Sequence, residues 1–127
     1  MSASIPKITL NDGVSIPSLG FGTYKLIGEK GSQAIQSAID SGYRLIVTAY
    51  NYENEGTVGE AVHKSSIPRN NLFIASKLPG RYHDYKKAIY IVQESLYRAR
   101  LDYYDMYLIT LAKPKTGDVR RGMASAY

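Results

Sequence analysis

The sequence contains no cysteine, and this absence excludes disulfide bonds and thiol chemistry. It also contains no tryptophan, although tyrosine occurs 12 times. No apolar run approaches the roughly 18 residues that a membrane-spanning helix requires. Met1–Ser4 lack the charged-then-apolar pattern of a secretion signal. These absences predict a soluble, cytoplasmic protein without a membrane partner.

Other chemical motifs are weak or missing. His63 and His83 stand alone without metal-ligand spacing, so we expect no metal site. The glycines of 20–22 and 56–59 lack the spacing of a dinucleotide fingerprint. The net charge of +5 suits a polyanion or a phosphorylated cofactor, but the basic residues are dispersed and accompany no nucleic-acid motif. We therefore expect a solvated basic surface and no nucleic-acid partner.

The stretch 42–55 combines a strand, a turn and the start of a helix. Its apolar run 45–47 is short, branched and preceded by Gly42, which predicts a strand. Asn54 is the expected N-cap of the helix that follows. Tyr52 therefore lies just past the carboxyl end of a strand, where parallel α/β sheets place their catalytic residues.

The rest of the chain predicts a β-hairpin followed by four strand–helix units. Asp12-Gly13 lies between two apolar segments and predicts a hairpin over 7–17. Strands are expected at about 18–22, 43–48, 72–76 and 104–110, separated by helical patterns. The expected helix ends are Ser32 and Gly42 for the first helix, Asp84 as the cap of the third and Asp118 as the cap of a short last helix.

These elements predict half of a barrel. A (β/α)8 barrel typically takes about 250 residues, so 127 residues make about half of one. The expected fold is α/β, a (βα)4 half of a TIM (β/α)8 barrel preceded by a β-hairpin. It forms a single domain over 1–127, with the four units at about 18–127 and the last unit truncated.

The stretch 42–55 also matches a family signature. It resembles the aldo-keto reductase pattern Gly-Tyr-Arg-x-x-Asp-Thr-Ala-x-x-Tyr-x-Asn-Glu at every fixed position except one, where Val47 stands in place of the catalytic Asp. The segments 8–14, 19–24, 72–78 and 95–109 resemble the family's opening hairpin, its first strand, its lysine-bearing strand, and its third helix with fourth strand. The family continues with His-Trp-Pro, whereas this chain has Thr110-Leu111-Ala112.

The resemblance implies carbonyl reduction, in which NADPH delivers hydride and a tyrosine donates a proton to the carbonyl oxygen. By position, Tyr52 is that proton donor. Lys77 is its partner, which the family's Asp holds and whose charge lowers the tyrosine pKa. Val47 and Thr110 replace this Asp and the His that orients the carbonyl.

The resemblance also implies where the cofactor binds. The family's adenosine and phosphate contacts, and the aromatic residue that stacks on nicotinamide, lie in strands five to eight. Only Gly22, Thr23 and Tyr24 match the segment on the nicotinamide side. We therefore expect that this chain binds no NADPH by itself, although the family uses it.

Loss of two of the four catalytic residues predicts a catalytically inactive chain, a truncated and engineered half-barrel. Tyr52 and Lys77 would then be ancestral residues without a present task. The alternative is a variant that keeps weak NADPH-dependent reduction of aldehydes or ketones.

A half-barrel leaves one face of its sheet open. Strands of parallel sheets are buried on both faces, and helices here cover only the outer one. The inner face is expected to include Val47, either Ser76 or Ile74, and either Leu108 or Thr110. Such a chain should form a homodimer or a larger even-numbered assembly that closes the ring by symmetry.

Two features of the third helix complete the expectations. Tyr90 and Tyr97 lie seven residues apart on its polar face, as either a contact patch or simply exposed tyrosines. The family commonly has Gly where this chain has Arg100, just past the last helical residue. A left-handed backbone there would cost Arg about 1 kcal/mol relative to Gly.

Overall fold

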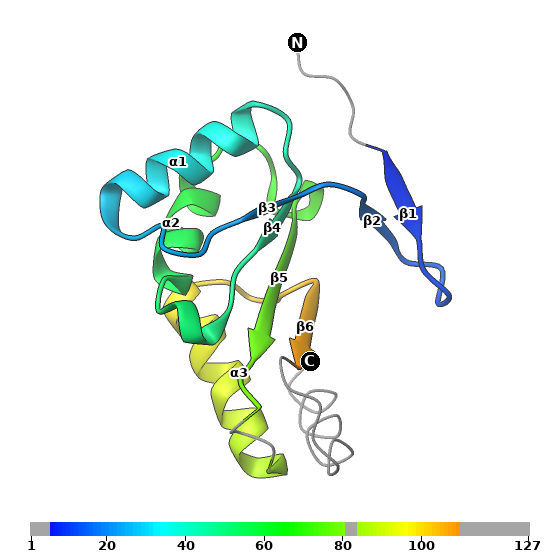
Figure 1. The fold of residues 1–127 in the computed structure, drawn as a ribbon, viewed down its shortest axis with the longest axis vertical. Coiled ribbons are helices and arrows are strands. Elements are labelled where there is room, and N and C mark those ends of the chain that lie inside the picture. Colours follow the sequence, from blue (N-terminus) through cyan, green and yellow to red (C-terminus); the bar gives the residue numbers. More distant parts are fainter. Residues whose placement is uncertain (1–5, 81–83, 110–127) are drawn as a thin grey trace.

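The computed structural model describes residues 6–80 and 84–109. A short antiparallel hairpin precedes a four-stranded parallel sheet in the order β3-β4-β5-β6, and helices connect the strands (Figure 1). The elements are β1 (Lys7–Thr9), β2 (Ser15–Pro17), β3 (Gly20–Gly22), α1 (Gly28–Asp40), β4 (Leu45–Val47), the 3-10 turn η1 (Tyr50–Tyr52), α2 (Glu55–Lys64), the 3-10 turn η2 (Arg69–Asn71), β5 (Phe73–Leu78), α3 (Tyr85–Ala99) and β6 (Met106–Ile109).

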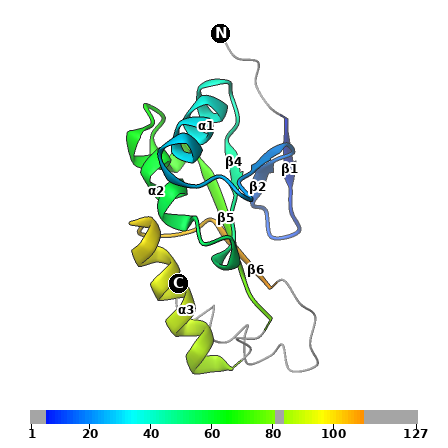
Figure 2. The same cartoon turned by 60° about the vertical axis from the view of Figure 1, so that its left-hand side comes forward.

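The three α-helices lie on one side of the sheet, and the hairpin lies away from them (Figure 2). A pocket between the hairpin and the sheet is lined by Lys7, Pro17, Arg44, Phe73 and Asp105, among others. Because Arg44 and Asp105 directly precede β4 and β6, the hairpin lies at the amino ends of the strands. The carboxyl ends, where Tyr52 was expected, are left free of it.

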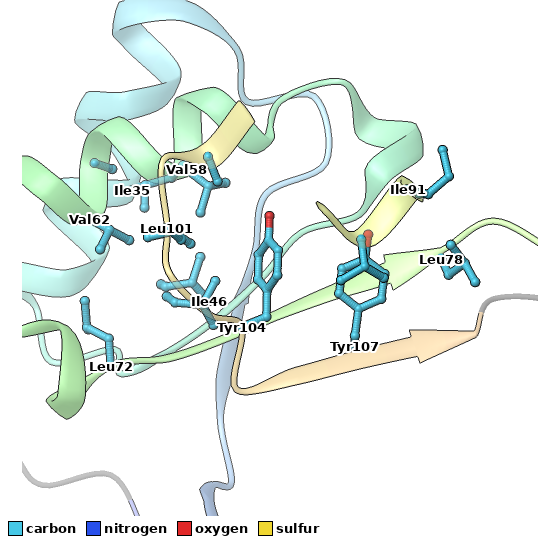
Figure 3. Close-up of a cluster of buried hydrophobic side chains, with 14 of the residues drawn as sticks. Ile35, Ile46, Val58, Val62, Leu72, Leu78, Ile91, Leu101, Tyr104 and Tyr107 are labelled. Carbon is cyan, nitrogen blue, oxygen red and sulfur yellow. The ribbon is translucent and has the colours of Figure 1, made fainter. Parts of the chain in front are cut away.

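The core fills the space between the sheet and the helices, where Tyr104 and Tyr107 pack among aliphatic side chains (Figure 3). Ile46 on β4 and Ile74 on β5 are fully buried in this cluster. Helix residues complete it, chiefly Ile35 and Ile39 of α1, Val58, Ala61 and Val62 of α2, and Ala88, Ile91 and Val92 of α3. Ala88, Ile91 and Val92 lie on the face of α3 that packs into this core.

Strand alternation decides which residues face the helices. Ile74, Ser76 and Leu78 are fully buried on the helix side of β5, so the expectation that Ser76 or Ile74 lines the open face was wrong. The neighbours of these residues, Ala75 and Lys77, share the opposite face. Leu108, which pairs with Lys77, is 44% exposed on that face, as expected. Thr110 lies outside the described residues.

The predicted helix ends are confirmed at Gly42 and Asp84, and the one predicted at Ser32 is wrong. Gly42 has φ 114° and follows α1, and Asp84 occupies the N-cap of α3. Ser32, however, is not the start of α1, because the helix already begins at Gly28, whose φ of 66° turns the chain into it. Asp118 lies outside the described residues. In the part of the chain that the structure describes, no helix has the length and apolar character needed to cross a membrane.

Candidate functional site

Tyr52 and Lys77 meet at the carboxyl end of the sheet. Tyr52 is the last residue of η1, which follows β4 after Thr48 and Ala49, and Lys77 is the penultimate residue of β5. The Lys77 Nζ donates a hydrogen bond of 2.7 Å to the Tyr52 hydroxyl and lies 4.8 Å from the centroid of its ring. The structure thus brings together two residues that are 25 positions apart in the sequence. An ammonium at this distance can stabilise negative charge on the phenolic oxygen.

Val47 lies on the same face of the sheet as Lys77. Val47 pairs with Ala75, two residues before Lys77 on β5, so their side chains project to the same side. The valine offers no oxygen to the Lys77 ammonium, and none of the ion pairs among the described residues includes Lys77. The position that would hold the lysine by charge is therefore apolar. Thr110, the other replaced position, is outside the described residues.

The segment after β3 brings an aromatic ring beside Tyr52. The ring of Tyr24 lies 5.1 Å from that of Tyr52 and is 64% exposed. Thr23 is fully buried, and both its amide and its hydroxyl donate to the Val47 carbonyl, at 3.1 and 2.9 Å. Gly22 is the last residue of β3. These three residues supply one aromatic surface and no charged side chain.

Asn54 holds this segment in place, a role that its prediction as an N-cap missed. Its side chain makes no capping hydrogen bond. Instead it donates to the carbonyls of Thr23 at 2.6 Å and Leu26 at 2.9 Å, and it accepts a bond of 2.9 Å from Thr48. A buried amide that makes three hydrogen bonds fixes the loop that carries Tyr24 against the end of β4. Asn54 and Thr48 both stand in the signature, but their partners in the loop after β3 do not.

The two histidines make no cluster in the described structure. The Nε2 of His63 lies 2.6 Å from the backbone oxygen of Arg100, just past the end of α3. His83 is outside the described residues. No group of three or more potential metal ligands occurs among the residues that are described.

The sequence comparison identifies the family that these features suggest. The model of the aldo/keto reductase family matches residues 18–123. The chain belongs to the aldo-keto reductase family. It is 48% identical over 126 residues to 2,5-diketo-D-gluconic acid reductase B of Corynebacterium sp. (strain SHS752001), covering 97% of this chain and 46% of that protein. It is 44% identical over 109 residues to morphine 6-dehydrogenase of Pseudomonas putida, covering 86% of this chain and 37% of that protein.

Solved structures of aldo-keto reductases share the fold. The chain superposes on one from Brucella melitensis with a TM-score of 0.89 and 33% identity, covering 96% of this chain and 49% of the other. A Bombyx mori aldo-keto reductase in complex with NADP gives a TM-score of 0.84 and 32% identity, covering 98% and 47%. The chain thus spans about half the length of the relatives that it matches. The predicted fold, a (βα)4 half of a TIM barrel, is confirmed.

Proposed function

We propose that this chain is an aldo-keto reductase half-barrel that carries the proton-donating pair but does not catalyse carbonyl reduction by itself. The observation that carries the proposal is the combination of an assembled Tyr52–Lys77 contact with an apolar Val47 on the same face. The pair is in place, and the carboxylate that would hold its lysine is replaced.

The chemistry explains why the pair alone is insufficient. Bound NADPH would supply a hydride to the carbonyl carbon, and the chain's own task is to donate a proton from Tyr52 to the carbonyl oxygen. Lys77 stabilises the phenolate left behind only while its ammonium stays beside the hydroxyl, and Val47 gives it no counter-charge. Removing members of one catalytic unit costs several orders of magnitude in rate, and these losses do not add.

The few contacts that Gly22, Thr23 and Tyr24 could make with the cofactor also support an inactive chain. Tyr24 can contact one side of a nicotinamide ring, but the Thr23 hydroxyl is already bonded to Val47 and Gly22 has no side chain. We therefore expect no measurable affinity of this chain for NADPH, and the family's cofactor becomes relevant only where the remaining contacts are supplied.

The test follows the loss of NADPH absorbance with a reactive aldehyde. We expect the unmodified chain and Tyr52→Phe to show the same background rate. The double change Val47→Asp with Thr110→His should leave that rate unchanged, because the contacts that the family pattern assigns to Gly22, Thr23 and Tyr24 reach only the nicotinamide side of the cofactor. A rate near that of an ordinary family member would overturn the proposal.

A second candidate is residual NADPH-dependent reduction of aldehydes or ketones, favoured by the 2.7 Å contact between Lys77 and Tyr52. It predicts a slow rate above background that disappears in both Tyr52→Phe and Lys77→Met. The same assay therefore separates the two candidates, because the inactive chain is insensitive to either substitution.

We also propose that the chain associates with itself through the open face of its sheet. Leu108 is 44% exposed there, next to the position of Lys77, and Val47 lies on the same face. Within the described residues, β3 and β6 each have a neighbour on one side only. A second copy could cover this face and pair with these edges.

A further inference from the structure

A buried carboxylate lies directly behind the Tyr52–Lys77 pair. Glu55, in the first turn of α2, is 2% exposed. Its Oε2 accepts hydrogen bonds from the hydroxyls of Ser76 on β5 at 2.5 Å, of Ser95 on α3, and of Tyr104 at 3.2 Å. One oxygen atom thus joins α2, β5, α3 and the segment before β6.

This arrangement is costly for a purely structural feature. Glu55 takes part in none of the ion pairs among the described residues, and its Oε1 is buried without a partner there. A carboxylate removed from water destabilises the fold unless its oxygens are well bonded, and apolar side chains of similar volume fill such a position at lower cost. The start of α2 compensates in part, because a helix N-terminus favours negative charge.

The tyrosine of the cluster remains a donor. Burial, and next the charge of Glu55, raise the pKa of Tyr104 above its ordinary range. Its hydroxyl therefore keeps its proton at neutral pH and lies within hydrogen-bond distance of both Glu55 and Ser95. The cluster is a permanent set of hydroxyl donors around one carboxylate oxygen.

The hydrogen bond between Glu55 and Ser76 joins the two backbone segments that carry Tyr52 and Lys77. Glu55 follows Tyr52 by three residues, and Ser76 directly precedes Lys77. Because side chains alternate along a strand, Ser76 faces Glu55 on the helix side while Lys77 faces Tyr52 on the open side. The Glu55–Ser76 bond and the Lys77–Tyr52 bond therefore connect the same two segments, one on each face of β5.

From this geometry we propose that Glu55 is a positioning residue. Its hydrogen bond to Ser76 fixes the position of Tyr52 along β5, and so its position relative to Lys77. The proposal rests on the assignment of Tyr52 and Lys77 as the proton-donating pair. The side chain of Glu55 bonds to neither the Tyr52 side chain nor the Lys77 side chain. Glu55 acts by fixing the start of α2, and with it η1, beside Ser76 on β5.

The test reads the environment of the Tyr52 hydroxyl directly. Tyrosine labelled with carbon-13 at the ζ position reports on its hydrogen bonding by NMR, and Tyr52→Phe identifies the resonance. Lys77→Met gives the position of that resonance when the Lys77–Tyr52 bond is absent. Circular dichroism establishes that each variant is folded.

Ser76→Ala and Ser95→Ala form a matched pair. Both serines are fully buried and both donate to the same oxygen of Glu55, but only Ser76 lies on the strand that carries Lys77. We expect Ser76→Ala to move the Tyr52 resonance most of the way to its position in Lys77→Met. Ser95→Ala should leave it in place, because it releases only α3 from the cluster.

Two outcomes overturn the proposal: both serine variants move the resonance, or neither does. If Ser76→Ala does not fold, Glu55→Gln decides, since its weaker neutral acceptor should shift the resonance partly and an unchanged resonance rejects the role. Turnover of NADPH by the unmodified chain would overturn the proposed lack of activity and leave this test unaffected.

Discussion

Arg100 adopts a backbone conformation that is sterically unfavourable for a residue other than glycine. Its sequence position, where the family commonly has Gly, indicated this cost. It ends α3 with φ 55° and ψ 42°, in the left-handed region predicted from the family's glycine. Its amide still donates to the Tyr97 carbonyl, and that of Leu101 donates to Leu96, so the cap is intact. The cost therefore lies in the backbone conformation that a Cβ disfavours.

Arg100→Gly should raise the free energy of unfolding by about 1 kcal/mol, because glycine adopts this conformation without the steric cost. Arg100→Ala is the control, since alanine removes the long side chain but keeps the Cβ. In urea titration, Arg100→Gly should have a higher unfolding midpoint than both the unmodified chain and Arg100→Ala. Equal midpoints for the glycine and alanine variants would contradict the backbone explanation.

Tyr104 makes stability depend on alkaline pH. Its pKa is raised in the folded chain, by burial first and by Glu55 second, from the ordinary value of 10.0. Above about pH 10 the unfolded chain releases this proton and the folded chain keeps it, so the folded state binds more protons and loses stability as pH rises. The contribution is fully present below that pH.

We expect Tyr104→Phe to flatten the fall of the free energy of unfolding between about pH 9 and pH 11, by up to about 1.4 kcal/mol per pH unit. The matched control is Tyr97→Phe, because Tyr97 is 80% exposed and should leave the slope unchanged. Parallel slopes for the unmodified chain and Tyr104→Phe would show that Tyr104 ionises normally in the folded state.

At the residue scale, the sequence predicted contacts only where a family pattern contained both partners. Tyr52 and Lys77 were expected to lie together, and their catalytic role stays a prediction. Asn54 and Glu55 stand in the same signature, yet only capping and a helix start were expected of them. Their bonding partners lie 31 and 21 residues away, and no local pattern specifies such a pairing.

Helices α2 and α3 illustrate what glycine does at the element scale. A Cβ on Gly59 would lie 1.8 Å from the Ala99 carbonyl oxygen, so only glycine allows the two backbones to approach this closely. Gly56, one turn earlier, has more room, with the Arg98 carbonyl 3.3 Å from the same hypothetical atom. The glycines of 56–59, which lack the spacing of a dinucleotide fingerprint, thus allow α2 and α3 to pack closely.

Gly59→Ala should lower the free energy of unfolding by roughly 1–3 kcal/mol or more, because a methyl group there forces α2 away from α3. Gly56→Ala is the matched control. It gains about 0.5–1 kcal/mol from better helix propensity, offset by a tight contact, so its stability should change little. Equal effects of the two substitutions in thermal unfolding would contradict the close approach.

Element types were predictable and one boundary was not. Hydrophobic spacing predicted the order of strands and helices, because each element buries one face with its own period. The N-cap of α1 was placed five residues late, at Ser32 instead of Ile27. The prediction favoured a side-chain cap, whereas the structure begins the helix at Gly28 without one, following Ile27 in an extended conformation.

Among the described residues, helices cover one face of the sheet and leave the other face without a helix. The helices bury Ile46, Ile74 and Tyr107 on one side of the sheet. Val47, Lys77 and Leu108 share the other side, which the described helices do not reach. The sequence predicted this division from the parallel sheet, but it assigned Ser76 or Ile74 to the wrong face, because a continuous apolar strand gives no alternation to follow.

The chain should therefore form a homodimer or a larger even-numbered assembly in solution. Exposed apolar faces of parallel sheets are rarely tolerated by soluble monomers, and folding coupled to assembly makes the unfolding midpoint rise with protein concentration. Sedimentation velocity at micromolar concentration measures the mass, and a well-folded monomer of 14.1 kDa would refute self-association.

Val47→Asp is the sharper probe of which face is used. Because an Asp at this position could pair with the Lys77 ammonium on the same face, Val47→Asp is combined with Lys77→Met. The unpaired carboxylate loses its hydration in a closed, apolar interface, so the dissociation constant should rise by about tenfold or more, while the helical circular dichroism stays unchanged. Gln93→Asp adds the same charge on exposed α3 and should leave the assembly intact. If instead Tyr97→Ser dissociates the assembly and the combined Val47→Asp and Lys77→Met variant does not, the contact runs through α3, where Tyr90 and Tyr97 are exposed. The open sheet face is then not the interface.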